Sequence, residues 1–202
     1  MRDETRKGGL GEARRARPLL CSPSWRYFII WGKDLYIMEG KRQDTAAAIL
    51  RLQQIVAKLR SKEGCPWDRK QTHESLKPAC IEEAAEVLGG IAILKATGKA
   101  ENLKEELGDL LLQVVFHAQL AEEEGLFSLA DVMETVSDKM VRRHPHVFHE
   151  PMLAEDGRPL TEWKEIKAAE KQGREWEEAY LPEAFGEAAA LMERAKARKG
   201  IS

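Results

Sequence analysis

The chain has 202 residues, enough for one domain with appendages and a sizeable buried core. Its 32 basic and 34 acidic side chains nearly balance, which excludes a broadly basic nucleic-acid-binding protein, and we expect no stable nucleic-acid binding. No apolar stretch approaches the roughly 20 residues that cross a bilayer, and a secretory signal is a poor fit, so we expect no membrane association. The three cysteines form no C-x-x-C pair, which favours a reducing cytoplasm.

Residues 1–37 differ from the rest of the chain. They combine Arg-rich polar sequence with a short aromatic run, and they show no helical period. We expect this segment to be poorly ordered, or to be an upstream extension of a protein that begins at Met38. An ordered element at a subunit interface is the alternative.

Helical signals dominate from Asp44 onward. Apolar residues recur at intervals of three and four from Ile49 to Leu59, which predicts one buried helical face, and Gly64 is expected to end that helix. The segment GCPWD, residues 64–68, combines glycine and proline with tryptophan. This composition indicates a shaped loop rather than a helix.

Further helices are expected along the rest of the chain. Thr72 can cap the next helix, in which Pro78 either introduces a kink or marks the first turn. A capping box of Ser128 and Asp131 is expected to start a later helix. The expected helices cover about residues 72–98, 99–124, 128–143, 161–172 and 182–199. Because no strand alternation or internal repeat is present, the sequence predicts an all-α helical bundle.

Two acidic clusters, IEEAAEVLGG and EELGDLL, lie in consecutive expected helices. Glu83 and Glu86 are three residues apart, as are Glu106 and Asp109, so each pair projects from one helical face. Both pairs border apolar residues, where ionised carboxylates are costly unless a cation compensates their charge. A ligand set made only of carboxylates suits a hard cation, either Mg²⁺ or Mn²⁺.

Other interpretations of these clusters exist. Glutamate is a good helix former, so either pair alone is more typical of a solvated helical face than of a metal site. A di-iron bundle would use Glu-x-x-His motifs, and neither cluster contains one. Mg²⁺ keeps several waters and contacts substrate phosphates, so the pattern favours chemistry on phosphate esters.

Three segments resemble the MazG family of nucleoside triphosphate pyrophosphohydrolases. They are GCPWDRKQTHESLKPACIEEAAEVLGGI, EELGDLLLQVVFHAQLAEEEG and DKMVRRHPHVF, and the resemblance extends over about residues 44–172. The resemblance implies an all-α bundle of the NTP pyrophosphatase type, completed by dimerisation into a homodimer. It also implies a catalytic domain at residues 38–175, followed by a helical C-terminal tail at residues 176–202.

The family signature is E-E-x-x-E followed by E-x-x-D. The resemblance implies that its residues here hold Mg²⁺ as ligands, namely Glu83, Glu86, Glu106 and Asp109. Glu82 and Glu83 are then the candidate catalytic carboxylates, with Glu82 orienting the attacking water. The implied reaction is hydrolysis of NTPs or dNTPs between the α- and β-phosphates to a nucleoside monophosphate and pyrophosphate, a house-cleaning activity on the nucleotide pool.

The substrate-binding candidates are three cations and two tryptophans. Lys139 and Arg143 share one helical face and correspond to triphosphate-binding groups of the family, and Arg142 is a further candidate. Without the resemblance, cations at a helix C-terminus are explained by the helix dipole. Trp163 matches a family position that contacts the nucleotide, and Trp67 is a candidate for stacking on the base. Either tryptophan can instead serve packing.

Two alternative functions remain open at this stage. One is a non-catalytic helical interaction or regulatory module that retains the fold. The other is a pyrophosphatase specialised for one nucleotide, such as dUTP. Many relatives carry two such modules in tandem, whereas this chain has one set of motifs, so a role that needs a second module is not implied.

Overall fold

The computed structural model describes residues 35–148, 153–154 and 156–201. Residues 47–202 form one compact unit. Of the other unit, residues 1–46, only the beginning of a helix is described, so the predicted extension at residues 1–37 lies almost entirely outside the described residues.

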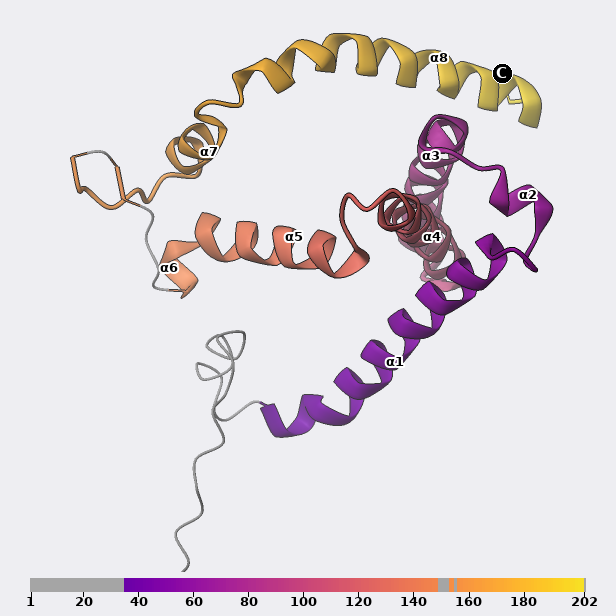
Figure 1. The fold of residues 1–202 in the computed structure, drawn as a ribbon, viewed down its shortest axis with the longest axis horizontal. Coiled ribbons are helices and arrows are strands. Elements are labelled where there is room, and N and C mark those ends of the chain that lie inside the picture. The colour runs from indigo at the N-terminus through magenta and orange to yellow at the C-terminus, as the bar shows by residue number, and fades with distance from the viewer. Residues whose placement is uncertain (1–34, 149–152, 155, 202) are drawn as a thin grey trace, which may run out of the picture. The chain divides into compact units, whose positions relative to one another are not determined.

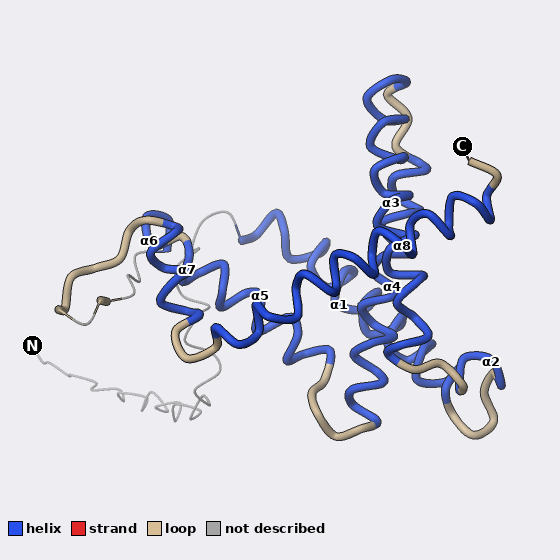
Figure 2. Tube along the Cα trace, turned by 90° about the horizontal axis from the view of Figure 1, so that it is seen from above, coloured by secondary structure: helices blue, strands red, loops and turns tan. Residues whose placement is uncertain are grey.

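Helices follow one another along the described chain (Figures 1 and 2). They are α1 (Leu35–Arg60), α2 (Pro66–Arg69), α3 (His73–Thr97), α4 (Glu101–Glu123), α5 (Leu129–Arg143), α6 (Pro145–Phe148), α7 (Trp163–Lys171), the 3₁₀ helix η2 (Glu175–Tyr180) and α8 (Leu181–Lys199). The described residues contain no strand, only an isolated bridge between Leu153 and Pro159, which confirms the predicted all-α class. None of the described helices is both long and apolar enough to span a membrane.

The helix boundaries follow from local sequence signals. The Thr72 hydroxyl accepts a hydrogen bond from the Ser75 amide at 3.2 Å, and Ser128 and Asp131 cap each other's backbone amides at the start of α5. Gly98 ends α3 in the left-handed region at φ 73°, where a residue without a Cβ is unstrained. Both predicted caps are therefore confirmed.

Two local predictions need correction. Of the two alternatives for Pro78, the first-turn position is wrong: Pro78 lies inside α3, and the helix continues past it although proline cannot donate to the preceding turn. The GCPWD segment was expected to be a loop, but its last three residues begin the short helix α2, which ends at Arg69. Gly64 allows the tight approach to this helix, because a Cβ there would lie 2.1 Å from the Leu59 carbonyl oxygen.

The buried core joins α1, α3, α4 and the start of α5. Its buried members are Val56, Leu76, Val115, Phe116, Ala118, Leu120 and Leu129. Arg60, at the end of α1, forms polar contacts beside this core. Its guanidinium donates hydrogen bonds to the backbone carbonyls of Asp68 and Gln71 at 2.6 and 3.1 Å. The same guanidinium forms an ion pair with Glu123 of α4 at 2.7 Å. These contacts hold the α2 turn against the ends of α1 and α4.

Helices α3 and α4 form an antiparallel hairpin and lie side by side (Figures 1 and 2). The two backbones come close at Gly90, which is buried: a Cβ built there would lie 2.8 Å from the Leu103 Cα atom. Real Cβ atoms essentially never make so short a contact. Glycine at position 90 therefore permits the close packing of the hairpin, whereas its neighbour Gly89 meets nothing within 4 Å.

We predict opposite effects for alanine at the two adjacent glycines. Gly90→Ala forces α3 away from α4 and is expected to lower the free energy of unfolding by about 1–3 kcal/mol, a typical overpacking cost. Gly89→Ala adds helix propensity without a clash and is expected to be neutral or to stabilise by up to about 1 kcal/mol. Urea unfolding followed by circular dichroism measures both. Equal stability of the two variants would contradict the close-packing account.

Candidate metal centre

Three carboxylates from α3 and α4 converge on one point. Glu83, Glu106 and Asp109 each offer an oxygen, and these oxygens all lie within 4.8 Å of one another. The register of the hairpin explains why these carboxylates converge. Gly90 and Leu103 face each other, Glu83 lies about two helical turns before Gly90, and Asp109 lies about two turns after Leu103. All three residues are partly buried.

The electrostatics of this cluster are unfavourable without a cation. Burial raises the pKa of the Glu83 carboxyl above its usual range, and the neighbouring charges of Glu86, Asp109 and Glu106 raise it further. Asn102 donates a hydrogen bond to Glu106 Oε1 at 2.7 Å and so orients that carboxylate. The site therefore concentrates negative charge and holds it in place.

The donor set fits a hard divalent cation. All three groups are carboxylates and none is a histidine or cysteine, which suits Mg²⁺ or Mn²⁺ better than zinc or copper. Three carboxylates also leave coordination positions for water and for substrate oxygens, as Mg²⁺ in phosphate-processing sites requires. The residues present thus match the chemistry predicted from the two acidic clusters.

The other two predicted carboxylates have different partners. Glu86 forms an ion pair with Lys199, and Glu82 pairs with Arg198 and with Lys199, whose Nζ lies 3.1 Å from Glu82 Oε1. The hydrogen bond from Arg198 lowers the pKa of Glu82, which keeps its carboxylate ionised. The sequence interpretation missed both cations, because more than 100 residues separate them from their partners and no motif links the two segments.

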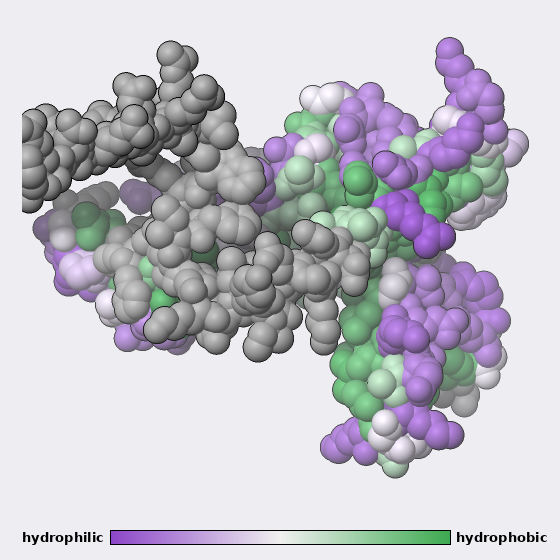
Figure 3. Space-filling model, turned by 90° about the horizontal axis from the view of Figure 1, so that it is seen from below, coloured by the Kyte–Doolittle hydropathy of each residue, from purple (hydrophilic) through white to green (hydrophobic). Residues whose placement is uncertain are grey.

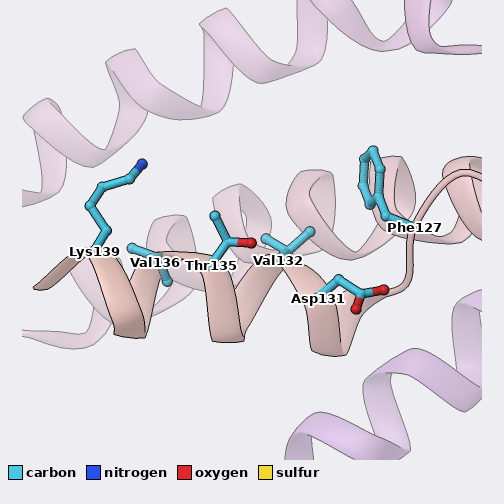
Figure 4. A pocket seen from close by; sticks show the side chains of 6 residues that line it. All are labelled: Phe127, Asp131, Val132, Thr135, Val136 and Lys139. Carbon is cyan, nitrogen blue, oxygen red and sulfur yellow. The ribbon is translucent and has the colours of Figure 1, made fainter. Parts of the chain in front are cut away.

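Lys139 lies on α5 beside an open cavity of about 420 Å³. Figure 4 shows its side chain in a row with others on α5, and with Phe127 just before the helix. The lining residues are Phe127, Asp131, Val132, Thr135, Val136 and Lys139. No ion-pair partner contacts Lys139 within the part of the chain that the structure describes, so its ammonium is available to an anionic ligand.

Arg142, Arg143 and Trp163 come together where α5 meets α7. Glu170 of α7 pairs with both arginines, at 3.2 Å to Arg142 and 2.6 Å to Arg143. The Arg143 guanidinium also lies over the Trp163 ring, 5.0 Å from its centroid, and His144 meets the same ring edge-on. The sequence analysis named all three residues as substrate-binding candidates but missed Glu170, which belongs to no recognised motif.

Trp67 lies on α2 and is 65% exposed. Its side chain therefore does not fix the GCPWD segment by packing. The backbone does so instead, since the Trp67 carbonyl accepts hydrogen bonds from the Lys70 amide and from the Gln71 side chain, both at 3.1 Å. The indole face is accessible to a stacking partner.

Comparison with known families gives one domain match. Residues 71–148 match the model of the MazG nucleotide pyrophosphohydrolase domain. This range contains all three clustered carboxylates together with Glu82, Glu86 and the cations at the end of α5. It excludes α7 and α8.

Curated proteins give consistent matches. The chain is 53% identical over 117 residues to the nucleoside triphosphate pyrophosphohydrolase/pyrophosphatase MazG of Thermotoga maritima, covering 58% of this chain and 43% of that protein. It is 45% identical over 122 residues to the nucleoside triphosphate pyrophosphohydrolase of Escherichia coli K12, covering 60% and 45% of the two chains. An uncharacterized Bacillus subtilis protein, YabN, is 48% identical over 121 residues, covering 60% of this chain and 24% of its own length. The matches thus span less than half the length of these relatives.

Proposed function

We propose that this protein, whose residues 71–148 match the model of the MazG nucleotide pyrophosphohydrolase domain, hydrolyses nucleoside triphosphates between the α- and β-phosphates. The products are a nucleoside monophosphate and pyrophosphate. The observation that carries the proposal is the convergence of Glu83, Glu106 and Asp109 inside the matched range. Nucleoside triphosphates are metabolites of the cytoplasm, and we place the protein there.

The proposed cofactor is Mg²⁺, with Mn²⁺ as the alternative. Glu83, Glu106 and Asp109 would hold the ion, and Glu86, one helical turn from Glu83, would be the fourth carboxylate ligand. Bound there, the ion would neutralise charge on the substrate phosphates and favour attack at phosphorus.

The protein's own side chains have separate proposed roles. Glu82 remains ionised beside the cluster, so its carboxylate can accept a hydrogen bond from the attacking water and orient it, and Glu83 is the other candidate base. Lys139 and Arg143, with Arg142, would bind the triphosphate. Trp163, already stacked on Arg143, would support the nucleotide, and Trp67 presents a free ring face to a base.

We propose that a second copy of the chain completes the bundle. Large apolar side chains on α3 and α4 reach solvent in the single chain, including Leu88, which is 68% exposed, and Figure 3 shows hydrophobic surface on the face in view. The exposed apolar residues on these two helices are Leu88, Ile91, Ile93, Leu107, Leu111 and Val114. Burying such a surface against a second copy removes it from water.

The dimer proposal predicts that charge on this surface separates the copies. A Leu88→Glu, Leu107→Glu double variant is expected to run as a monomer in sedimentation at micromolar concentration, because glutamates opposite one another repel and lose hydration. Glu74→Gln, a change at an exposed α3 residue outside this set, is the control and is expected to leave the assembly intact. A wild-type protein that sediments only as a monomer would contradict the proposal.

The reaction itself is tested with purified protein, Mg²⁺ and a panel of NTPs and dNTPs. We expect a nucleoside monophosphate and pyrophosphate in equal amounts, because attack at the α-phosphorus releases both. Chromatography identifies the nucleotide product, and a coupled assay measures pyrophosphate without prior cleavage. Release of a nucleoside diphosphate with orthophosphate would refute the cleavage site, and no turnover of any nucleotide would favour a non-catalytic module.

Variants connect that reaction to the carboxylates. Glu86→Ala and Asp109→Asn are each expected to lower turnover by more than about 100-fold. Each variant removes a carboxylate ligand, so the divalent cation that neutralises the phosphates is bound poorly. Glu105→Gln, an exposed change on α4 beside the site, is the charge-matched control and should retain activity. Circular dichroism shows whether each variant remains helical.

A further inference from the structure

The C-terminal helix α8 packs against α3, outside the range that matches the family domain. Figure 1 shows α8 passing across α3. Its attachment comes from the middle of the helix, where Leu191 and Ala195 are buried and Glu187 pairs with Lys77 of α3 at 3.1 Å. These contacts all precede the last turn of α8.

That last turn nevertheless makes specific contacts with the acidic face of α3. Lys199 pairs with both Glu82 and Glu86, and Arg198 pairs with Glu82. The Glu82 side chain is only 17% exposed and that of Glu86 is 32% exposed, so the two cations cover much of these carboxylates. Both carboxylates flank Glu83, a member of the three-carboxylate cluster.

We propose that Arg198 and Lys199 form an autoinhibitory cap, in which Lys199 competes with the divalent cation for Glu86. The inference rests on the proposed function, because it takes Glu86 as a ligand of the ion. Lys199 is paired with Oε1 of Glu86, so that oxygen is not available to a metal ion while the ion pair persists. Binding of the ion through this oxygen therefore displaces Lys199 and releases the last turn of α8.

The proposed cap is reversible for a physical reason. The side chains of Arg198 and Lys199 remain 60% and 39% exposed, and ion pairs that water can reach are weak and exchange readily. A divalent cation held by several carboxylates interacts more strongly than one ammonium. The cap therefore sets the concentration of free cation at which the site fills, rather than preventing its filling.

Titration calorimetry with Mg²⁺ alone, without nucleotide, tests the competition. Lys199→Gln is expected to bind Mg²⁺ about fivefold more tightly than the wild type, a change of the size that one partly exposed ion pair produces. The control is Lys196→Gln, which removes the same charge from the same helix but breaks only a pair with Glu193, at 2.8 Å within α8. Equal affinities of Lys199→Gln and Lys196→Gln would overturn the proposal.

Hydrogen exchange gives a second readout, independent of affinity. In the wild type, saturating Mg²⁺ is expected to speed amide exchange at the end of α8, over residues 196–201, while the amides near Leu191 stay protected. Exchange that is unchanged or slower would overturn the cap. If no variant binds Mg²⁺ at all, the proposed metal site fails together with the cap, whereas equal Mg²⁺ binding by all variants removes the cap alone.

Discussion

The close packing of α3 against α4 is the constraint on which the site depends. Gly90 lets the two backbones approach at Leu103, and the register of that contact brings Glu83 opposite Glu106 and Asp109. A larger residue at position 90 would separate the helices and open the cluster. The same glycine thus fixes the core of the hairpin and the distances between carboxylates on different helices.

Placing those carboxylates together costs stability, and the chain offsets the cost in two ways. Burial and the charges of the neighbouring carboxylates raise the pKa of Glu83, because they disfavour its ionised form. Arg198 and Lys199 neutralise the flanking Glu82 and Glu86 from the C-terminal helix. In our account a divalent cation neutralises the three clustered carboxylates. The protein's own cations and the metal ion then act on one continuous acidic surface.

Local signals in the sequence predicted most of the fold. The caps at Thr72 and Ser128 and the helix-ending Gly98 depend only on neighbouring residues, and the structure confirms them. Helical spacing pointed to four carboxylates on two helices; Glu83, Glu106 and Asp109 converge, whereas Glu86 forms an ion pair with Lys199.

Other features depend on contacts that no local pattern encodes. The cations on α8 reach Glu82 and Glu86 from more than 100 residues away, and Glu170 joins two arginines across α5 and α7. Proline propensity left two positions open for Pro78, and its place inside α3 follows because the packing of a long helix outweighs one missing backbone hydrogen bond.

The central claim is that repulsion among the packed carboxylates is relieved by a divalent cation. The folded state raises the pKa of Glu83, so ionising this carboxyl destabilises the protein. Stability falls as pH rises from the unfolded-state pKa to the folded-state pKa, and it stays lower at higher pH. Thermal unfolding of the wild type and of Glu83→Gln at neutral pH, in EDTA and in Mg²⁺, tests this directly. The account predicts a higher Tm for Glu83→Gln in EDTA and a much smaller rise with Mg²⁺. If Glu83→Gln has the wild-type Tm in EDTA and the wild-type rise with Mg²⁺, the account is wrong.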